Sequence, residues 1–276
     1  MLESYTFFSR QIVQAILAGV MLASVGMFVV LRRMIFVGLT TAQASAMCYA
    51  GVLVFGLSTP LVLPLSFGAM LPLLLKQRAE SSNREAALAS AFVLFFAGTE
   101  VLVSLGSRAE MHVVQAFSGN VLNMPELPWA LLVVLCVGFL VLFAACFRLF
   151  SRVFFDRDCA QLHGDRVQVA DLLFFALLVA SASLGTMLLG ATYTMAHLII
   201  PGAAVVPLAR SMRASWIGCM VVSTAGTLAG FSLSFLPWNL EGEIRHLPSS
   251  SAVIACLGCL YLLLRLVRAL RRFKRL

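Results

Sequence analysis

The sequence predicts an all-α, polytopic membrane protein, and three observations lead to this fold class. The chain has 276 residues, of which 61% are hydrophobic and only 12% are charged, and its mean hydropathy is +0.97. Average soluble chains are about a quarter charged, so these residues cannot cover a soluble globule of this size. Apolar stretches also recur along the chain, most of them close to the roughly 20 residues that a helix needs to cross the hydrocarbon core. We therefore expect one transmembrane domain, residues 1–276, with a lipid-facing surface.

About nine apolar stretches are expected to form helices, which points to eight or nine transmembrane helices. In order they are residues 11–31, 36–57, 60–75, 86–106, 129–148, 170–189, 191–209, 214–236 and 251–267. Arg32-Arg33 ends the first stretch, and a Ser58-Thr59-Pro60 turn separates the second from the third. That junction and the one at Gly190-Ala191 are so tight that either could be a broken or re-entrant helix, and a count of eight fits nearly as well. Gly226 and Gly230 form a GxxxG pair, which favours close helix packing.

The basic residues predict the orientation of the chain. If the nine stretches all cross the membrane, seventeen of the 20 lysines and arginines fall in loops on one side. They are Arg32, Arg33, Lys76, Arg78, Arg84, Arg148, Arg152, Arg157, Arg166, Arg210, Arg213, Arg265, Arg268, Arg271, Arg272, Lys274 and Arg275. Only Arg10, Arg108 and Arg245 fall on the other side. Because cytoplasmic loops retain positive charge, we expect a cytoplasmic C-terminus and an extracytoplasmic N-terminus.

This topology also explains the net charge of +8 without nucleic acid as a partner. The basic tail at about 268–276 is expected to lie against anionic membrane lipid instead.

The longest cytoplasmic loop, about 149–169, carries a pattern that points to a partner protein. Asp158, Ala160 and Gly164 follow the spacing of the short coupling helix of ABC importer permeases. Phe155, Cys159 and Leu162 can form an apolar stripe on such a helix, and Gly164 permits a sharp turn after it. We expect this element to sit in a groove on an ATPase, and the alternative is an ordinary solvated loop helix.

Further motifs, in order along the chain, resemble those of the permease subunits of zinc/manganese-type metal ABC importers. They are Phe28-Val29-Val30-Leu31-Arg32-Arg33-Met34 with Gly38 and Ala42-Gln43-Ala44, the outer-loop stretch Val113–Leu122, the segment from Phe155-Asp156 to Gly164, Gly190 with Leu198–Ala204, and Leu247-Pro248-Ser249. The resemblance covers nearly the whole chain.

The resemblance implies a fold related to the permeases of cobalamin and iron-chelate importers. It also implies a homodimer or a heterodimer with a second permease, two ABC ATPase subunits, and a periplasmic or lipid-anchored substrate-binding protein. ATP and Mg²⁺ would bind to the ATPase, and this chain would bind no cofactor. The expected location is the bacterial cytoplasmic (inner) membrane.

The chain departs from this family at a site for the cargo. Family members usually carry an aspartate directly after the glycine that aligns with Gly38 and a histidine four residues later, so that both side chains share a helix face and can hold Zn²⁺ or Mn²⁺. Here these positions hold Leu39 and Gln43. Three explanations stay open: a partner permease supplies the ligands, the site has moved, or the cargo is not a bare metal ion.

Polar residues inside the apolar stretches are the remaining candidates for the substrate pathway. Glu100 is expected to face the interior of the bundle, because a charge near the bilayer centre costs about 2.5–3.5 kcal/mol. Tyr193 and His197 lie four residues apart on one helix face, and hydrogen bonding between helices is the alternative role for both. With Gln43 and Met47 these residues form the predicted pathway, in which Glu100 and His197 are the candidate metal ligands.

The sequence therefore favours the transmembrane permease of an ABC importer for a divalent metal ion of the zinc, manganese or iron class, or for a metal chelate. The chain contains no GxxxxGK[ST] phosphate-binding loop, so it is not expected to be an enzyme, and a separate ATPase would supply the energy. The alternatives are an ABC permease for a non-metal substrate, an ion-coupled secondary transporter, and a scaffold subunit that does not line the pathway.

Overall fold

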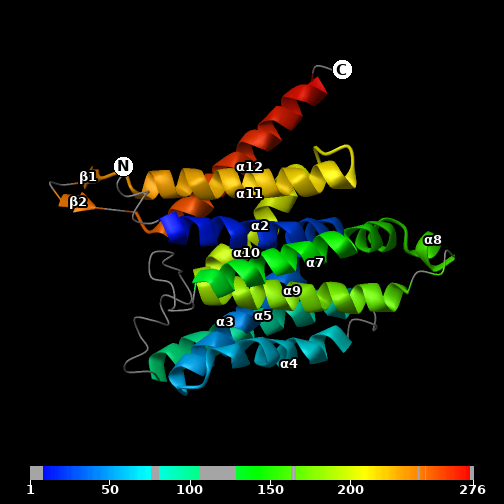
Figure 1. Ribbon diagram of the computed structural model, residues 1–276, viewed down its shortest axis with the longest axis horizontal. Helices are drawn as coiled ribbons and strands as arrows, with labels where there is room; N and C mark the ends of the chain where they lie inside the picture. The colour runs from blue at the N-terminus through cyan, green and yellow to red at the C-terminus, as the bar shows by residue number, and fades with distance from the viewer. Residues whose placement is uncertain are drawn as a thin grey trace.

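The fold is a bundle of apolar helices packed around one central helix, α2, which contacts α3, α7, α9, α10 and α11. The computed structural model describes residues 9–75, 81–105, 129–162, 164, 166–240, 243–245 and 247–273. The helices are α2 (Ser9–Leu31), α3 (Ile35–Val54), the 3₁₀ helix η1 (Thr59–Leu61), α4 (Val62–Leu75), α5 (Ser81–Leu105), α7 (Trp129–Phe155), α8 (Arg157–Leu162), α9 (Val167–Leu189), α10 (Ala191–Val205), α11 (Met212–Ser234) and α12 (Ser249–Phe273). In Figure 1 most of the long helices run roughly along the long axis, with α3, α4 and α5 on one side of α2 and with α11 and α12 on the other.

Each of the nine predicted apolar stretches corresponds to a helix. Within the described residues, α2, α3, α5, α7, α9, α11 and α12 are long and apolar enough to span a membrane. The other two helices, α4 and α10, are shorter, with 14 and 15 residues, or about 21–22 Å at 1.5 Å per residue. Both follow a predicted break, at Pro60 in η1 and at Gly190, whose φ of 87° interrupts the helix. The expected count of eight or nine spans is thus close to what the structure contains.

Successive helices alternate in direction, so the chain has two distinct ends in the bundle. Helices α2, α7 and α12 finish at the end where α8 lies, and the hairpin that joins α11 to α12 lies at the opposite end (Figure 1). We call these the α8 end and the hairpin end. Arg32, Arg152, Arg166 and Arg213 are all at the α8 end.

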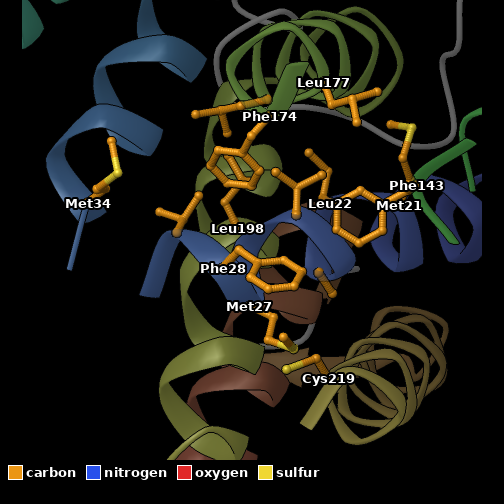
Figure 2. Close-up of a cluster of buried hydrophobic side chains, with 14 of the residues drawn as sticks. Met21, Leu22, Met27, Phe28, Met34, Phe143, Phe174, Leu177, Leu198 and Cys219 are labelled. Carbon is orange, nitrogen blue, oxygen red and sulfur yellow. The ribbon is translucent and has the colours of Figure 1, made fainter. Parts of the chain in front are cut away.

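Phe28 near the end of α2 is at the centre of the largest hydrophobic core. Its ring meets five other phenylalanine rings at centroid distances of 5.5–6.2 Å. Four of them, Phe143, Phe147, Phe150 and Phe154, recur every three or four residues along α7, and the fifth is Phe174 of α9. Figure 2 shows Phe28 and Leu22 of α2 beside Phe174 and Leu198, where α2, α9 and α10 meet. This aromatic cluster fixes α7 and α9 against α2.

Glycines allow the central helices to approach one another closely. A Cβ atom at Gly26 of α2 would collide with the backbone of Leu198 on α10. In the predicted GxxxG pair, a Cβ atom at Gly226 would collide with the side chain of Leu257 on α12, and one at Gly230 with the backbone of Val253. This confirms that the pair is a helix-packing motif, because only glycine leaves room for the opposing chain.

Two features differ from the sequence prediction. Helix α7 continues to Phe155, about two turns beyond its expected end at 148, because Phe150 and Phe154 pack on Phe28 and Phe174 and hold these turns in the core. A short antiparallel hairpin, β1 (Trp238–Leu240) and β2 (Glu243–Arg245), joins α11 to α12, with Trp238 opposite Arg245. The fold is still all-α in class. The outer-loop stretch 113–122 lies outside the described residues.

The close contact of α11 with α12 gives a stability prediction. Gly230→Ala puts a methyl group against the backbone of Val253, which cannot move aside as a flexible side chain would, and overpacking of this kind costs typically 1–3 kcal/mol. We expect the midpoint of thermal unfolding in detergent to fall by several degrees. The matched control is Gly258→Ala on α12, where a Cβ atom meets nothing within 4 Å. If the unfolding midpoint fell no further for Gly230→Ala than for Gly258→Ala, this packing would be contradicted.

Candidate functional site

Helix α8 lies at the predicted coupling segment, and all of its residues except Ala160 are exposed. It starts directly after α7, and Asp156 caps it: the backbone N–H of Cys159 donates to Asp156 Oδ1 at 2.9 Å. A carboxylate in this position satisfies one of the free N–H groups of the first turn. Ala160, only 4% exposed, packs with Val153, Val167 and Ala170 and holds α8 against α7 and α9.

The opposite side of α8 presents apolar side chains to the surroundings. Phe155 is 81% exposed and Leu162 is 87% exposed, and Cys159 between them is exposed as well. These three residues form the predicted apolar stripe, and Asp158 is also exposed. Large apolar side chains that the described residues leave uncovered are typical of a surface that binds another protein.

Gly164 adopts the backbone conformation predicted for it. Its φ is +78°, in the left-handed region that glycine enters without steric cost. Its N–H donates to the carbonyl of Gln161 at 3.0 Å, so the chain turns sharply after α8. The turn directs the chain back toward α9.

An ion-pair network ties α8 to the bundle. Arg157 of α8 donates to Asp171 Oδ2 at 2.9 Å, and Arg32, just after α2, contacts Asp171 Oδ1 at 3.1 Å. The side chains of Arg32 and Asp171 are only 17% and 20% exposed. The Arg32 guanidinium also lies over the ring of Phe154, 4.2 Å from its centroid. One carboxylate of α9 therefore links α8 to the end of α2.

The five predicted pathway residues fall into two separate groups. The first lies between α3 and α5: Gln43 is fully buried and donates through Nε2 to Thr99 Oγ1 at 3.4 Å. The other amide atom, Oε1, is buried and has no hydrogen-bond partner among the described residues. Met47, one turn further along α3, is half-buried, and its sulfur lies close to Gly98 of α5.

Glu100 is on α5 beside this first group but points away from it. The structure shows it exposed on the surface of the single chain, so the prediction that it faces the interior of this bundle is wrong. The reason is geometric: Thr99 occupies the face of α5 that packs on α3, and the next residue is rotated by 100°. Val101 beside it is 58% exposed.

The second group lies between α2, α10 and α11 and is completely enclosed. Tyr193 and His197 are stacked, with ring centroids 3.9 Å apart. The Tyr193 hydroxyl donates to the carbonyl of Ala15 at 3.0 Å and is 3.1 Å from Thr227 Oγ1. The His197 ring nitrogens lie 3.1 Å from the Tyr193 carbonyl and 3.2 Å from Thr227 Oγ1. The contacts with Ala15 and Thr227 join α10 to α2 and α11, whereas the contacts between Tyr193 and His197 lie within α10, so in this conformation His197 has a packing role.

The structure does not join Glu100 and His197 into one metal site. His197 is fully buried with both ring nitrogens bonded elsewhere, and Glu100 is exposed on another helix. Among the described residues no three His, Cys, Asp or Glu side chains cluster closely enough to hold a metal ion.

Comparison with known proteins decides the family. The family model described as the ABC 3 transport family matches residues 4–268. The chain belongs to this family. It is thus a multi-pass permease of the ABC transporter class, which removes the ion-coupled secondary transporter as an alternative.

The relatives agree with this assignment. The chain is 23% identical over 242 residues to the manganese import system permease protein ScaB of Streptococcus parasanguinis, covering 87% of this chain and 85% of that one. An uncharacterized membrane protein of Cyanophora paradoxa is 22% identical over 238 residues, covering 83% and 78%.

Two solved structures share the fold. PsaBC from Streptococcus pneumoniae, in complex with Fab, superposes with a TM-score of 0.81 at 17% identity and covers 96% of this chain and 95% of that one. A metal-chelate type ABC transporter in an inward-facing conformation superposes with a TM-score of 0.63 at 18% identity, covering 95% and 88%.

Sequence reasoning missed the role of Asp171. It counted Arg32 and Arg157 only as loop charges, although Asp171 lies within the apolar stretch 170–189. A carboxylate there requires a partner, and the arginines of adjoining loops were available. The signal was therefore present, but the choice of partner depends on how α2, α8 and α9 pack.

The network predicts that Asp171→Asn loosens α8. Asparagine keeps an acceptor oxygen but loses the charge that two arginines share. We expect the free energy that holds α8 on the bundle to fall by about 1–2 kcal/mol, between the values for exposed and buried ion pairs. A spin label on Cys159, with the other cysteines replaced by alanine, should become more mobile. The control, Asp158→Asn, removes an exposed carboxylate from the same helix and should leave the spectrum unchanged. Equal mobility of the spin label in both variants would contradict the role of Asp171 in holding α8 on the bundle.

Proposed function

We propose that this ABC 3 family member is the transmembrane permease of an importer that moves a divalent metal ion of the zinc, manganese or iron class, or a metal chelate, across the bacterial cytoplasmic membrane. Two ATPase subunits on its cytoplasmic side supply the energy, and an extracytoplasmic binding protein delivers the cargo. The observation that carries the proposal is the family match over residues 4–268 together with an exposed coupling helix at the predicted segment. The named function of ScaB, manganese import, supports metal as the cargo class.

The geometry of α8 supports a mechanical role in this importer. Phe155 and Leu162 are free to enter a groove on the ATPase, and Ala160 and Arg157 hold the other side of α8 on the bundle. When ATP binding brings the ATPase subunits together, the force acts on α8 and passes through Asp171 to α9 and to the end of α2. The bundle then changes the side to which its pathway opens.

The exposure of Glu100 supports a pathway between two permease subunits. On the surface of α5 its carboxyl group would meet lipid, at a cost of about 2.5–3.5 kcal/mol near the bilayer centre. A second permease facing α5 removes this cost and places Glu100 on a central, polar route. Gln43 with its unpaired Oε1 lies one helix behind it. The sequence is compatible with either a homodimer or a heterodimer.

The residues at the family's metal-binding positions limit the kinds of cargo that this chain could hold. Leu39 provides no ligand and Gln43 provides only a neutral carbonyl oxygen, whereas Zn²⁺ and Mn²⁺ are usually held by imidazole or carboxylate groups. A chelate, or ligands from a partner permease, is compatible with these residues. A non-metal substrate of an ABC permease is the second candidate, and the absence of a family-type Asp/His pair favours it.

The distribution of arginines supports the proposed orientation. Arg32, Arg152, Arg166 and Arg213 lie at the α8 end, and positively charged loops are retained in the cytoplasm. We therefore propose that α8 and the C-terminal end of α12 are on the ATPase side. The hairpin and the N-terminus then face the binding protein.

Coupling is tested at Gly164 in the assembled importer. Gly164→Pro forbids the positive φ and removes the N–H that donates to Gln161, so α8 should lose its position. We expect ATP hydrolysis to continue while metal uptake falls at least about ten-fold, without loss of assembly. The matched control is Gly164→Asn, because asparagine tolerates the left-handed conformation and should keep most of the uptake. Normal uptake by the proline variant would refute coupling through α8.

Metal binding by the permease alone tests the cargo. We expect the purified chain to give no tight, stoichiometric binding of Mn²⁺ or Zn²⁺ in titration calorimetry. The variant Leu39→Asp with Gln43→His restores an acid and an imidazole four residues apart and should bind at least about a hundred-fold more tightly, or about 2.7 kcal/mol. The control variant Leu39→Asn with Gln43→Asn offers only neutral groups and should behave like the original chain. Tight binding of Mn²⁺ or Zn²⁺ by the unaltered chain would contradict the prediction that its own residues form no strong metal site.

A further inference from the structure

The enclosed polar cluster between α2, α10 and α11 has no part in the coupling role of α8. Its common member is Thr227 of α11, whose Oγ1 lies 3.2 Å from His197 Nε2 and 3.1 Å from the Tyr193 hydroxyl. The same hydroxyl donates to the carbonyl of Ser223 at 2.9 Å. Because a hydroxyl offers one hydrogen and two lone pairs, these partners saturate Thr227.

Ser223, one turn before Thr227 on α11, is in the opposite condition. It is fully buried, and its Oγ has no hydrogen-bond partner within the part of the chain that the structure describes. Other buried serines of the bundle, such as Ser24, Ser45 and Ser66, donate to the carbonyl four residues earlier on their own helix. Ser223 does not, and an unpaired buried hydroxyl has a desolvation cost that a partner from another helix would remove.

Gly19 of α2 leaves room between the His197 ring and Ser223. A Cβ atom at Gly19 would lie 2.9 Å from Ser223 Oγ, 2.9 Å from His197 Cδ2 and 3.0 Å from His197 Nε2. The Ser223 hydroxyl and the edge of the ring that carries Nε2 thus border the same point, which any larger residue would fill. A small movement of the ring therefore brings Nε2 to Ser223.

The backbone of α10 is interrupted on both sides of His197. Gly190, with its φ of 87°, separates α10 from α9. Pro201 lies inside α10 four residues after His197 and has no N–H, so the carbonyl of His197 lacks its usual helical partner. Between these points the backbone of Leu198 is in close contact with Gly26 of α2. The segment that carries His197 can therefore tilt at this contact without breaking further helical hydrogen bonds.

We propose that His197 is a two-position latch between α10 and α11. Its ring holds Thr227 in the conformation described here and transfers to Ser223 when the bundle changes the side to which it opens. The transfer moves the anchoring point of α10 by one helical turn, about 5.4 Å along α11, toward the α8 end. Packed helices move between discrete positions of this kind because interdigitated surfaces are bistable. The link to transport rests on the proposed function, whereas the exchange itself is a property of this chain.

Nuclear magnetic resonance of the full chain in detergent, with ¹³C-labelled histidine, tests the latch. The variant His197→Asn identifies the His197 ring signal, and in the free chain the two positions are in equilibrium. We expect Thr227→Val to move this signal toward the Ser223 position and Ser223→Ala to move it in the opposite direction. Each variant should change the ratio of the two positions about three-fold, the average effect of one hydrogen bond between transmembrane helices.

The matched control is Thr224→Val, next to Ser223 on α11. The Thr224 hydroxyl donates to the carbonyl of Met220 on its own helix at 2.9 Å, so its loss should leave the ratio of the two ring positions unchanged. An effect of Thr224→Val as large as that of Ser223→Ala would overturn the proposal, because it would show a general response of α11.

Two further results would also overturn it. An unchanged His197 signal in Ser223→Ala would show that the ring does not use this hydroxyl and that the cluster is a packing contact alone. Movement of the signal in the same direction in both variants would show that each lost hydroxyl merely loosens the helices. The measurement needs neither cargo nor ATPase, so failure of the latch leaves the proposed function standing, and absence of metal uptake leaves the latch standing.

Discussion

The contact of Phe28 with the aromatic side of α7 and with Phe174 of α9 is the interaction on which the α8 end of the molecule depends. Without a hydrophobic driving force between helices in lipid, association rests on close packing and polar contacts, and interlocking rings supply much of this packing here. The cluster extends α7 two turns beyond its expected end. Close to this cluster, Arg32 just after α2, Arg157 of α8 and Asp171 of α9 form the ion-pair network. Packing thus positions these charges, and the charges hold α8 on the bundle.

A short inner helix, α10, lies in the central part of the bundle. Helix α10 lies against α2, α3, α9, α11 and α12, and Gly190 frees it from α9 by a break in the backbone. The stacked Tyr193 and His197 fasten it to α2 and α11 through Ala15 and Thr227. A helix held at this junction moves only when its neighbours move. The polar contact between Gln43 and Thr99 lies elsewhere, between α3 and the buried face of α5.

The sequence predicted the class of fold, the order of the helices and a short helix in the segment before Gly164, because these depend on local properties: runs of apolar residues and the Asp158–Gly164 spacing. It predicted the position of Gly164 for the same reason. The extent of α7 could not be read locally, since it depends on distant rings. The orientation of Glu100 depends on which face of α5 packs on α3, and a single helix that is apolar on all sides does not reveal this. The partner of Asp171 also required the three-dimensional packing of α2 and α9.

Reconstitution tests the central claim most directly, namely that this permease moves its cargo only when a separate ATPase acts on α8. Proteoliposomes that contain the permease with its ATPase and binding protein are compared with proteoliposomes that contain the permease alone, with radioactive Mn²⁺ as the probe and ATP on the α8 side. The account predicts accumulation against a gradient in the first preparation, and only with ATP. Accumulation against a gradient by the permease alone would contradict it.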